Sequence, residues 1–193
     1  ALGRTLQKAP WGIAFPAVPL VYFDFVLKGE CWLRAPVPPF RQRVRAGEFL
    51  LVLDNTPHEL GSTPDSATQP IARIMPKLRE QQRRPIRAAR MPKGSAVVLY
   101  GTYQLQATLL SALRGLPRII HVGAGDIGAG EGGGQVQIKA LTDALTQEID
   151  RPGAGSQAVI DRLIDLLLVY ALRTCLKRPD AGSAAWVAAL RDP

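Results

Sequence analysis

The spacing of apolar residues changes once along this chain, and the change limits the folds that the chain can adopt. As far as Val122 the apolar residues occur in short runs that prolines and glycines interrupt, which is typical of strands joined by tight turns. From Gln135 onward they recur about every 3.6 residues, as at Ile138, Leu141 and Leu145, which is the period of an amphipathic helix. The sequence therefore predicts a strand-rich region followed by helices, with no strand after them.

The strand-rich region has the rhythm of an antiparallel barrel or sandwich, with a turn about every 8 to 12 residues. Gly29 is expected to form a tight turn between two hairpin strands, 20–27 and 31–34, and residues 41–45 to form an exposed edge strand. We predict a mainly β fold over residues 1–122. A glycine-rich connector at 123–134 and a subdomain of two to three helices at 135–193 would follow. Shorter helices are predicted at 108–113 and 183–190.

The corner from Arg45 to Leu60 is the sharpest local signal in the chain. A turn at 46–48 leads into five consecutive apolar residues, Phe49–Leu53, which predict a strand buried on both faces. A second turn at 54–57 ends that strand, and His58 follows at once. The turn directs this histidine, whose ring can bind a ligand or a metal, toward the start of the next strand.

The positive charge is concentrated in one stretch. The chain carries a net charge of +8. Between Ile71 and Lys93 there are eight basic residues and one acidic residue, Glu80, so the rest of the protein is close to neutral. Basic loops can contact phosphate groups, but no aromatic residue lies between these arginines to stack on bases. We therefore favour a solvated connecting loop at 70–94, in which four prolines leave room for little more than a helical turn near Ile74.

The glycine-rich segment 123–128 matches the dinucleotide-binding pattern G-x-G-x-x-G. In such a site the following helix begins within the motif, so that its amide groups meet the pyrophosphate. Here four further glycines precede the helix, and no second parallel strand with a ribose-binding acid is expected. We interpret the segment as a connector and expect no cofactor.

The two cysteines, Cys31 and Cys175, lie far apart in apolar runs and are expected to be reduced thiols in a cytoplasmic protein. The longest strictly apolar run, Leu166–Leu172, is much shorter than the about 20 residues that a membrane-spanning helix needs. A zinc site needs three or four ligands, and the strand region offers at most Asp24, Cys31 and His58. We favour a packed thiol and a hydrogen-bonded histidine over a metal site.

The second long helix, expected over Gln157–Lys177, is apolar around most of its circumference. A helix of this kind must be covered on more than one side. The barrel and the preceding helix can cover two sides. A second subunit is expected to cover another side through Leu163, Leu167 and Tyr170, and full burial within one subunit is the alternative. The polar residues form one stripe, Asp161, Arg162, Asp165 and Arg173.

Several phrases of the sequence resemble one family. Gly47, Leu53, Asn55 and His58 have the spacing of the second cupin motif, G-x5-P-x-G-x-x-H, with Leu53 in place of the proline and Asn55 in place of the second glycine. Over nearly its whole length the chain resembles the cupin-type N-terminal domain of AraC/XylS-type bacterial transcription regulators. The phrases that carry this resemblance are 26–33, 46–51 with 56–58, 116–122, 160–163 and 186–193.

The resemblance implies a cupin-like antiparallel barrel (a jelly roll) that senses a small-molecule effector and dimerises. It also implies that DNA is read by helix-turn-helix units, which are expected to lie outside these 193 residues. We therefore expect a homodimer that regulates transcription in the bacterial cytoplasm, contacts DNA only through such units and does not bind a membrane. Cupins with metal chemistry carry a His-x-His pair and a glutamate in the first motif. Asp24-Phe25-Val26 stands at that place, so an enzyme is not expected.

Strand alternation predicts which residues would line the barrel. Tyr22, Asp24 and Val26 share one face of their strand, and the resemblance places a cupin ligand on that face, with His58 and Tyr103 beside it. Two other functions remain open. One is a purely structural dimerisation module with a filled barrel, and the other is a cupin enzyme.

Overall fold

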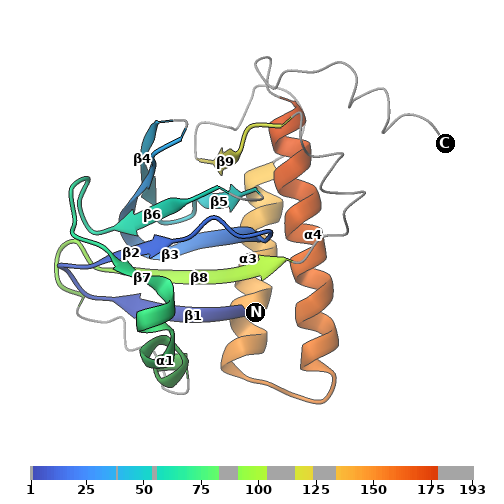
Figure 1. Cartoon of the computed structure of the whole chain (residues 1–193). Helices are drawn as coiled ribbons and strands as arrows, with labels where there is room; N and C mark the ends of the chain where they lie inside the picture. The colour runs from blue at the N-terminus through green and yellow to red at the C-terminus, as the bar shows by residue number, and fades with distance from the viewer. Residues whose placement is uncertain are drawn as a thin grey trace.

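The structure is a computed structural model that describes residues 2–37, 39–53, 56–82, 91–103, 116–123 and 134–177. Figure 1 shows a curled sheet with two long helices side by side against it, and the predicted mainly β fold with C-terminal helices is confirmed. The predicted short helices at 108–113 and 183–190 and most of the connector lie outside the described residues. The strands are β1 (Leu2–Gln7), β2 (Gly12–Phe15), β3 (Val21–Ala35), β4 (Phe40–Arg45), β5 (Phe49–Val52), β6 (His58–Gly61), β7 (Gln69–Pro70), β8 (Ala96–Tyr103) and β9 (Ile119–Val122), and the helices are α1 (Ile71–Gln82), α3 (Gly134–Asp150) and α4 (Ser156–Leu176).

Strand β3 joins the two halves of the sheet. Its first part pairs with β5 and β8, and its last part pairs with β4 and β6. The strand order is β1-β8-β3-β6-β2-β7, with β9 attached to β5. Because one long strand belongs to both halves, the sheet curls and the halves pack on each other across a shared interior.

Gly29 bends β3 and does not end it. The expected tight-turn hairpin at this glycine is wrong, because the strand runs without a break from Val21 to Ala35. A bulge between Val26 and Lys28 shifts its register against β8. Gly29 then adopts a φ of 79°, a left-handed conformation that only glycine takes without strain. The hairpin partner of the second part is β4, the strand that was expected at the edge.

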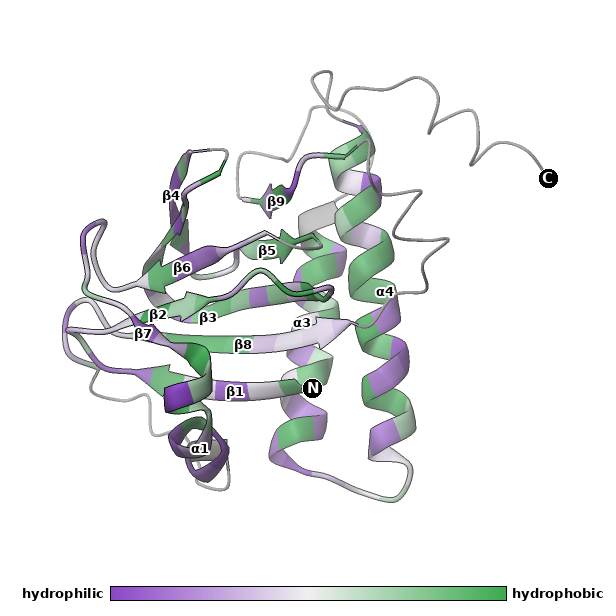
Figure 2. Ribbon diagram, in the orientation of Figure 1, coloured by the Kyte–Doolittle hydropathy of each residue, from purple (hydrophilic) through white to green (hydrophobic). Residues whose placement is uncertain are grey.

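The basic stretch begins with a helix. Helix α1 spans Ile71–Gln82 and contains Pro76, so the expectation of little more than one helical turn is wrong. Ile71 and Ile74 pack against the barrel and Leu78 is buried. This apolar face, at helical spacing, offsets the proline. Figure 2 shows that the rest of α1, like β4, is largely hydrophilic.

Two apolar clusters lie on opposite faces of the sheet. Strand β5 contributes to both: Leu50 belongs to the interior cluster, and Phe49 and Leu51 belong to the helix-side cluster. Residues Phe49–Leu53 are therefore buried on both faces, as predicted. The interior cluster is Trp11, Ile13, Phe15, Val26, Cys31, Leu33, Val44, Leu50, Leu60, Ala96 and Val98. The helix-side cluster joins β3, β5 and β8 to α3 and α4 and includes Phe23, Phe25, Phe49, Leu51, Leu99, Tyr103, Ile138, Leu145, Leu167 and Ala171.

The two long helices occupy the predicted segments. Helix α3 covers Gly134–Asp150 and α4 covers Ser156–Leu176. They pack on each other, and α4 also contacts β5 and β9. In the described part of the chain no helix combines the length and the apolar character needed to cross a membrane.

Replacement of Gly29 by alanine is expected to destabilise the fold strongly. The added Cβ would lie 2.2 Å from the Ser95 carbonyl oxygen, and alanine would also have to keep the left-handed φ, which costs about 1 to 2 kcal/mol. Gly47 is the matched control, because its φ is 88° and no atom lies within 4 Å of an added Cβ. Chemical denaturation should show a loss for Gly29→Ala at least about twice that for Gly47→Ala. Equal losses would contradict this account of the bend.

Candidate functional site

His58 is the first residue of β6, where the corner places it in the barrel interior. Its side chain is enclosed, with 1% of the residue exposed. The imidazole stacks on the ring of Phe15, its register partner on β2, with ring centroids 4.5 Å apart. The ring of Tyr22 meets it edge-on at 5.2 Å. Two aromatic side chains from β2 and β3 therefore hold the histidine in one orientation.

One hydrogen bond defines the protonation of this imidazole. Nδ1 lies 3.1 Å from the Thr56 carbonyl oxygen. A carbonyl oxygen only accepts, so Nδ1 carries the hydrogen and Nε2 presents its lone pair. Burial lowers the pKa of His58 to about 4, and the ring is neutral at neutral pH. In the described part of the chain Nε2 is closed off from solvent and has no hydrogen-bond partner.

Asp24 lies on the interior face of β3, two residues after Tyr22, whose ring contacts His58. Its neighbours along the strand alternate, with Tyr22 and Val26 packing in the interior and Phe23 and Phe25 on the helix side. Asp24 is 3% exposed. Burial raises the pKa of its carboxyl to about 7, and no hydrogen bond to it is found among the described residues. Asp24 is therefore a second polar group that the interior face buries.

The other residues around the carboxyl are apolar or protonated. Burial, and to a smaller extent the charge of Asp24, raises the pKa of the Tyr22 hydroxyl. Burial also raises the pKa of the Cys31 thiol, and the nearby carboxylates of Asp24, Glu30 and Glu48 add to the effect. Cys31 is thus a packed thiol and a poor nucleophile.

Tyr103 does not lie beside these residues, contrary to the expectation. On β8 it is the register partner of Val21, while Tyr100 is the partner of Asp24. Tyr103 therefore faces the helices, where it belongs to the helix-side cluster. Its hydroxyl donates a hydrogen bond to the backbone carbonyl of Ile164 in α4. The structure brings Tyr22, Asp24, Val26 and His58 to one face and Tyr103 to the other.

The three residues expected at a dimer interface are not the exposed residues of α4. Leu167 is fully buried in the helix-side cluster, and Leu163 and Tyr170 are half-buried against it. These residues hold α4 on its own subunit. The large apolar residues that α4 exposes are Val159, Leu166 and Val169, at 43%, 45% and 40%.

Two features of the site were not predicted from the sequence. The first is the contact between Phe15 and His58. Trp11, Ile13 and Phe15 are spaced two residues apart, which indicates one interior strand face, but the pairing of Phe15 with His58 depends on the register of β2 against β6. The buried carboxylate of Glu48 binds His121 Nε2 of β9 at 2.9 Å and accepts a hydrogen bond from the Arg45 amide. This pair connects the corner to the last strand before the helices.

A sequence profile of the cupins matches residues 1–177. The chain belongs to the cupin family. A search of curated proteins finds no match for this cupin.

Solved structures with similar folds share little sequence with this cupin. YhaK from Escherichia coli is 11% identical with a TM-score of 0.39, and the match covers 63% of this chain and 40% of that one. The AraC-like transcriptional activator CuxR is 12% identical with a TM-score of 0.45, covering 87% and 46%. ToxT from Vibrio cholerae O395 is 6% identical with a TM-score of 0.47, covering 94% and 58%. The cupin thus spans less than two thirds of the length of each.

Asp24, Cys31 and His58 are the weak candidates for metal ligands that the sequence offers. Among residues that the structure describes, no three His, Cys, Asp or Glu side chains lie close enough together to hold a metal ion. The Cys31 thiol, with its raised pKa, is a poor ligand in its protonated form.

Asp24 and His58 should give opposite pH dependences of stability. The Asp24 carboxyl has a pKa of 3.8 when unperturbed and about 7 in the fold. As the pH rises from 3.8 to about 7, its contribution to the unfolding free energy therefore falls, by at most about 1.4 kcal/mol per pH unit. The pKa of His58 is lowered from 6.5 to about 4. Its contribution therefore rises with pH over that interval and is lost as the pH falls.

Chemical denaturation of two variants separates the two effects. Asp24→Asn should become more stable relative to wild type as the pH rises from about 4 to about 7. His58→Phe should become less stable relative to wild type as the pH rises from about 4 to 6.5. Asp143→Asn, at an exposed position of α3, is the control and should follow wild type. An Asp24→Asn profile parallel to that of wild type would contradict the assignment.

Proposed function

We propose that this cupin is the sensor and dimerisation domain of an AraC-type transcription regulator, and that it binds a small-molecule effector inside the barrel. One observation carries the proposal: His58 Nε2 is buried on the interior face without a hydrogen-bond partner among the described residues, and the Asp24 carboxyl is buried on the same face. An unsatisfied buried polar group costs about 1 to 3 kcal/mol, and folded proteins leave few of them. A ligand that supplies both partners would recover this free energy.

The resemblance of the ordered sequence phrases to AraC/XylS-type regulators supports a regulatory role for the bound ligand. In this proposal the effector changes how attached DNA-binding units are presented. The chain itself would contribute sensing and dimerisation, and contacts with DNA would be made by those units.

Strand β8 offers a route from the interior to the helices. Tyr100 on one face of β8 is the register partner of Asp24, and Tyr103 faces the other way. The Tyr103 hydroxyl is bound to the Ile164 carbonyl of α4. A ligand that displaces β8 would therefore pull on α4 through this hydrogen bond. Tyr103 is in this proposal a coupling residue and not a pocket residue.

The exposed face of α4 supports a homodimer. Val159, Leu166 and Val169, with Arg162 and Arg173, are all exposed and follow the alternating three- and four-residue spacing of a coiled-coil seam. In a parallel pair of such helices each arginine would face its own copy, and like charges repel. In an antiparallel pair centred on Leu166, Arg173 lies near Val159 of the other subunit. The antiparallel pair is therefore favoured.

A thermal-shift screen of small molecules should identify ligands that stabilise the protein. Their effect should disappear in Asp24→Leu and in His58→Phe, because each variant removes one of the two acceptors. Glu59→Gln, on the outer side of β6, is the control and should keep the full shift. A screen without stabilising ligands, combined with more stable Asp24→Leu and His58→Phe variants, would favour the filled structural scaffold.

Tyr103→Phe should separate ligand binding from transmission. The variant removes the hydroxyl that binds Ile164 but leaves the interior face intact. Ligand affinity should stay within about twofold of wild type, whereas the effect of ligand on the dimer dissociation constant, measured by sedimentation, should be lost. An unchanged ligand effect would exclude this route.

Leu166→Glu and Val169→Glu should produce folded monomers in sedimentation experiments. Both side chains are exposed on α4, so a charge there disturbs an interface and not the subunit core. Leu167→Glu should instead unfold the protein, because Leu167 is fully buried. A dimer that survives both of the exposed substitutions would place the interface elsewhere.

A further inference from the structure

Two buried polar groups of the interior, Asp24 and His58, share one chemical property. His58 Nε2 presents a lone pair, because the hydrogen of the neutral ring is on Nδ1, which donates a hydrogen bond to the Thr56 carbonyl oxygen. The Asp24 carboxylate has only acceptor atoms when it is ionised. A complementary ligand must therefore supply hydrogen-bond donors to both. Asp24 and His58 are 3% and 1% exposed, so the ligand would be fully enclosed and hence small.

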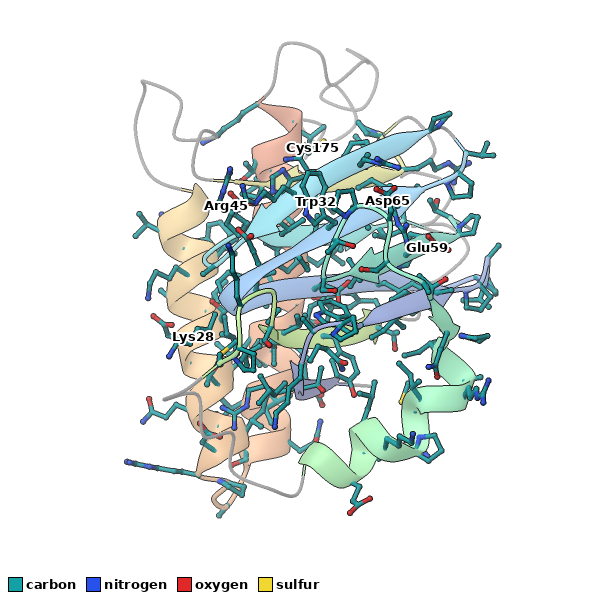
Figure 3. The ribbon with its side chains drawn as sticks, turned by 90° about the vertical axis from the view of Figure 1, so that its left-hand side faces the viewer. Lys28, Trp32, Arg45, Glu59, Asp65 and Cys175 are labelled. Carbon is teal, nitrogen blue, oxygen red and sulfur yellow. The ribbon has the colours of Figure 1, made fainter. Side chains whose placement is uncertain are left out.

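The charge of the interior restricts the ligand further. No lysine or arginine is among the buried residues in the described part of the chain. The arginines of β3 and β4 instead form ion pairs with acids, as Arg34 does with Glu59 and Arg43 with Glu30. Figure 3 shows this outer side of the second half of the sheet, where Trp32 of β3, Arg45 of β4 and Glu59 of β6 come from neighbouring strands. A carboxylate or phosphate inside the barrel would therefore meet Asp24 without a compensating cation.

The walls next to the two acceptors are aromatic. Phe15 stacks on His58, and Tyr22 lies edge-on both to His58 and to Phe15 at 5.3 Å. The negative faces of such rings attract cations, by about 0.5 to 2 kcal/mol when the cation is desolvated. Beyond the rings the interior cluster offers apolar side chains, including Val26, Leu50 and Val98.

We propose that the effector is a small organic amine in its ammonium form. Its N–H groups donate to the Asp24 carboxylate, His58 Nε2 accepts another hydrogen of the same molecule, and its hydrocarbon part lies on Phe15 and Tyr22. This inference rests on the proposed function and specifies the ligand class of the same site.

The inference includes a definite pH dependence. An ammonium ion binds the ionised form of Asp24, whose pKa is raised to about 7 by burial. Amine affinity should therefore fall about tenfold for each pH unit below that value and level off above it. The titratable groups around Asp24 are Tyr22 and Cys31 on β3, Tyr100 on β8 and His58 on β6, with Glu30 and Glu48 beyond Cys31.

The experiment compares ligands that differ only in their polar group. Benzylamine, benzyl alcohol and benzoate are titrated into the whole chain by isothermal calorimetry at millimolar concentrations, together with butylamine, butanol and butyrate. At least one amine should bind, with an affinity at least about tenfold higher than that of its matched alcohol and with no detectable binding of the carboxylate. Asp24→Asn should weaken amine binding by at least about tenfold and abolish its pH dependence. Asp65→Asn, an exposed carboxylate on the outer side, should change neither.

Each result distinguishes this inference from the proposed function. Binding of an alcohol at least as tight as that of its matched amine, or any binding of a carboxylate, would overturn the ammonium assignment and leave the sensor proposal intact if it depends on Asp24 or His58. Amine binding that is unchanged in Asp24→Asn would also overturn the assignment. If none of the six compounds binds, the ammonium inference fails. The sensor proposal fails as well only if the thermal-shift screen finds no ligand.

Discussion

The close approach of Gly29 to the Ser95 carbonyl oxygen is the contact on which the rest of the structure depends. Only a residue without a side chain can occupy that position, because any Cβ would lie 2.2 Å from the oxygen. Together with the bulge after Val26, this contact lets a single strand leave one half of the sheet and enter the other. The interior, the two clusters and the position of the helices all follow from that bend.

The same strand arranges the chemistry of the interior. Before the bend, β3 directs Tyr22, Asp24 and Val26 inward and Phe23 and Phe25 toward α3 and α4. The helix packing and the polar interior are therefore opposite faces of one element. A carboxyl group that is costly to bury is held in place by two phenylalanines that are favourable to bury. Stability supplied on the helix side thus permits the unsatisfied groups on the other side.

Patterns that are local in the sequence predicted the fold. The features that were not predicted depend on the register between two strands or on how a helix is turned about its own axis. The period change gave the order of strands and helices, and strict alternation placed Tyr22, Asp24 and Val26 on one face. Tyr103 was predicted on the wrong face, because a one-residue difference in register reverses every side chain of a strand. The sequence of residues 96–103 does not indicate that Tyr100 is the residue that pairs with Asp24. Likewise Leu166 and Leu167 are adjacent in a helix that is apolar nearly all round, yet one is exposed and the other buried. Gly29 has the same local signal whether it reverses a strand or bends it.

Strand β4 has a consequence for how copies of this protein meet. It pairs with β3 on one side and has no partner strand on the other among the described residues. An open edge of this kind is a template for uncontrolled strand pairing between molecules. Arg41, Arg43 and Arg45 alternate along it, and charged side chains on an edge strand discourage pairing with another strand. The charged side chains of β4 therefore act as a guard against aggregation through this edge.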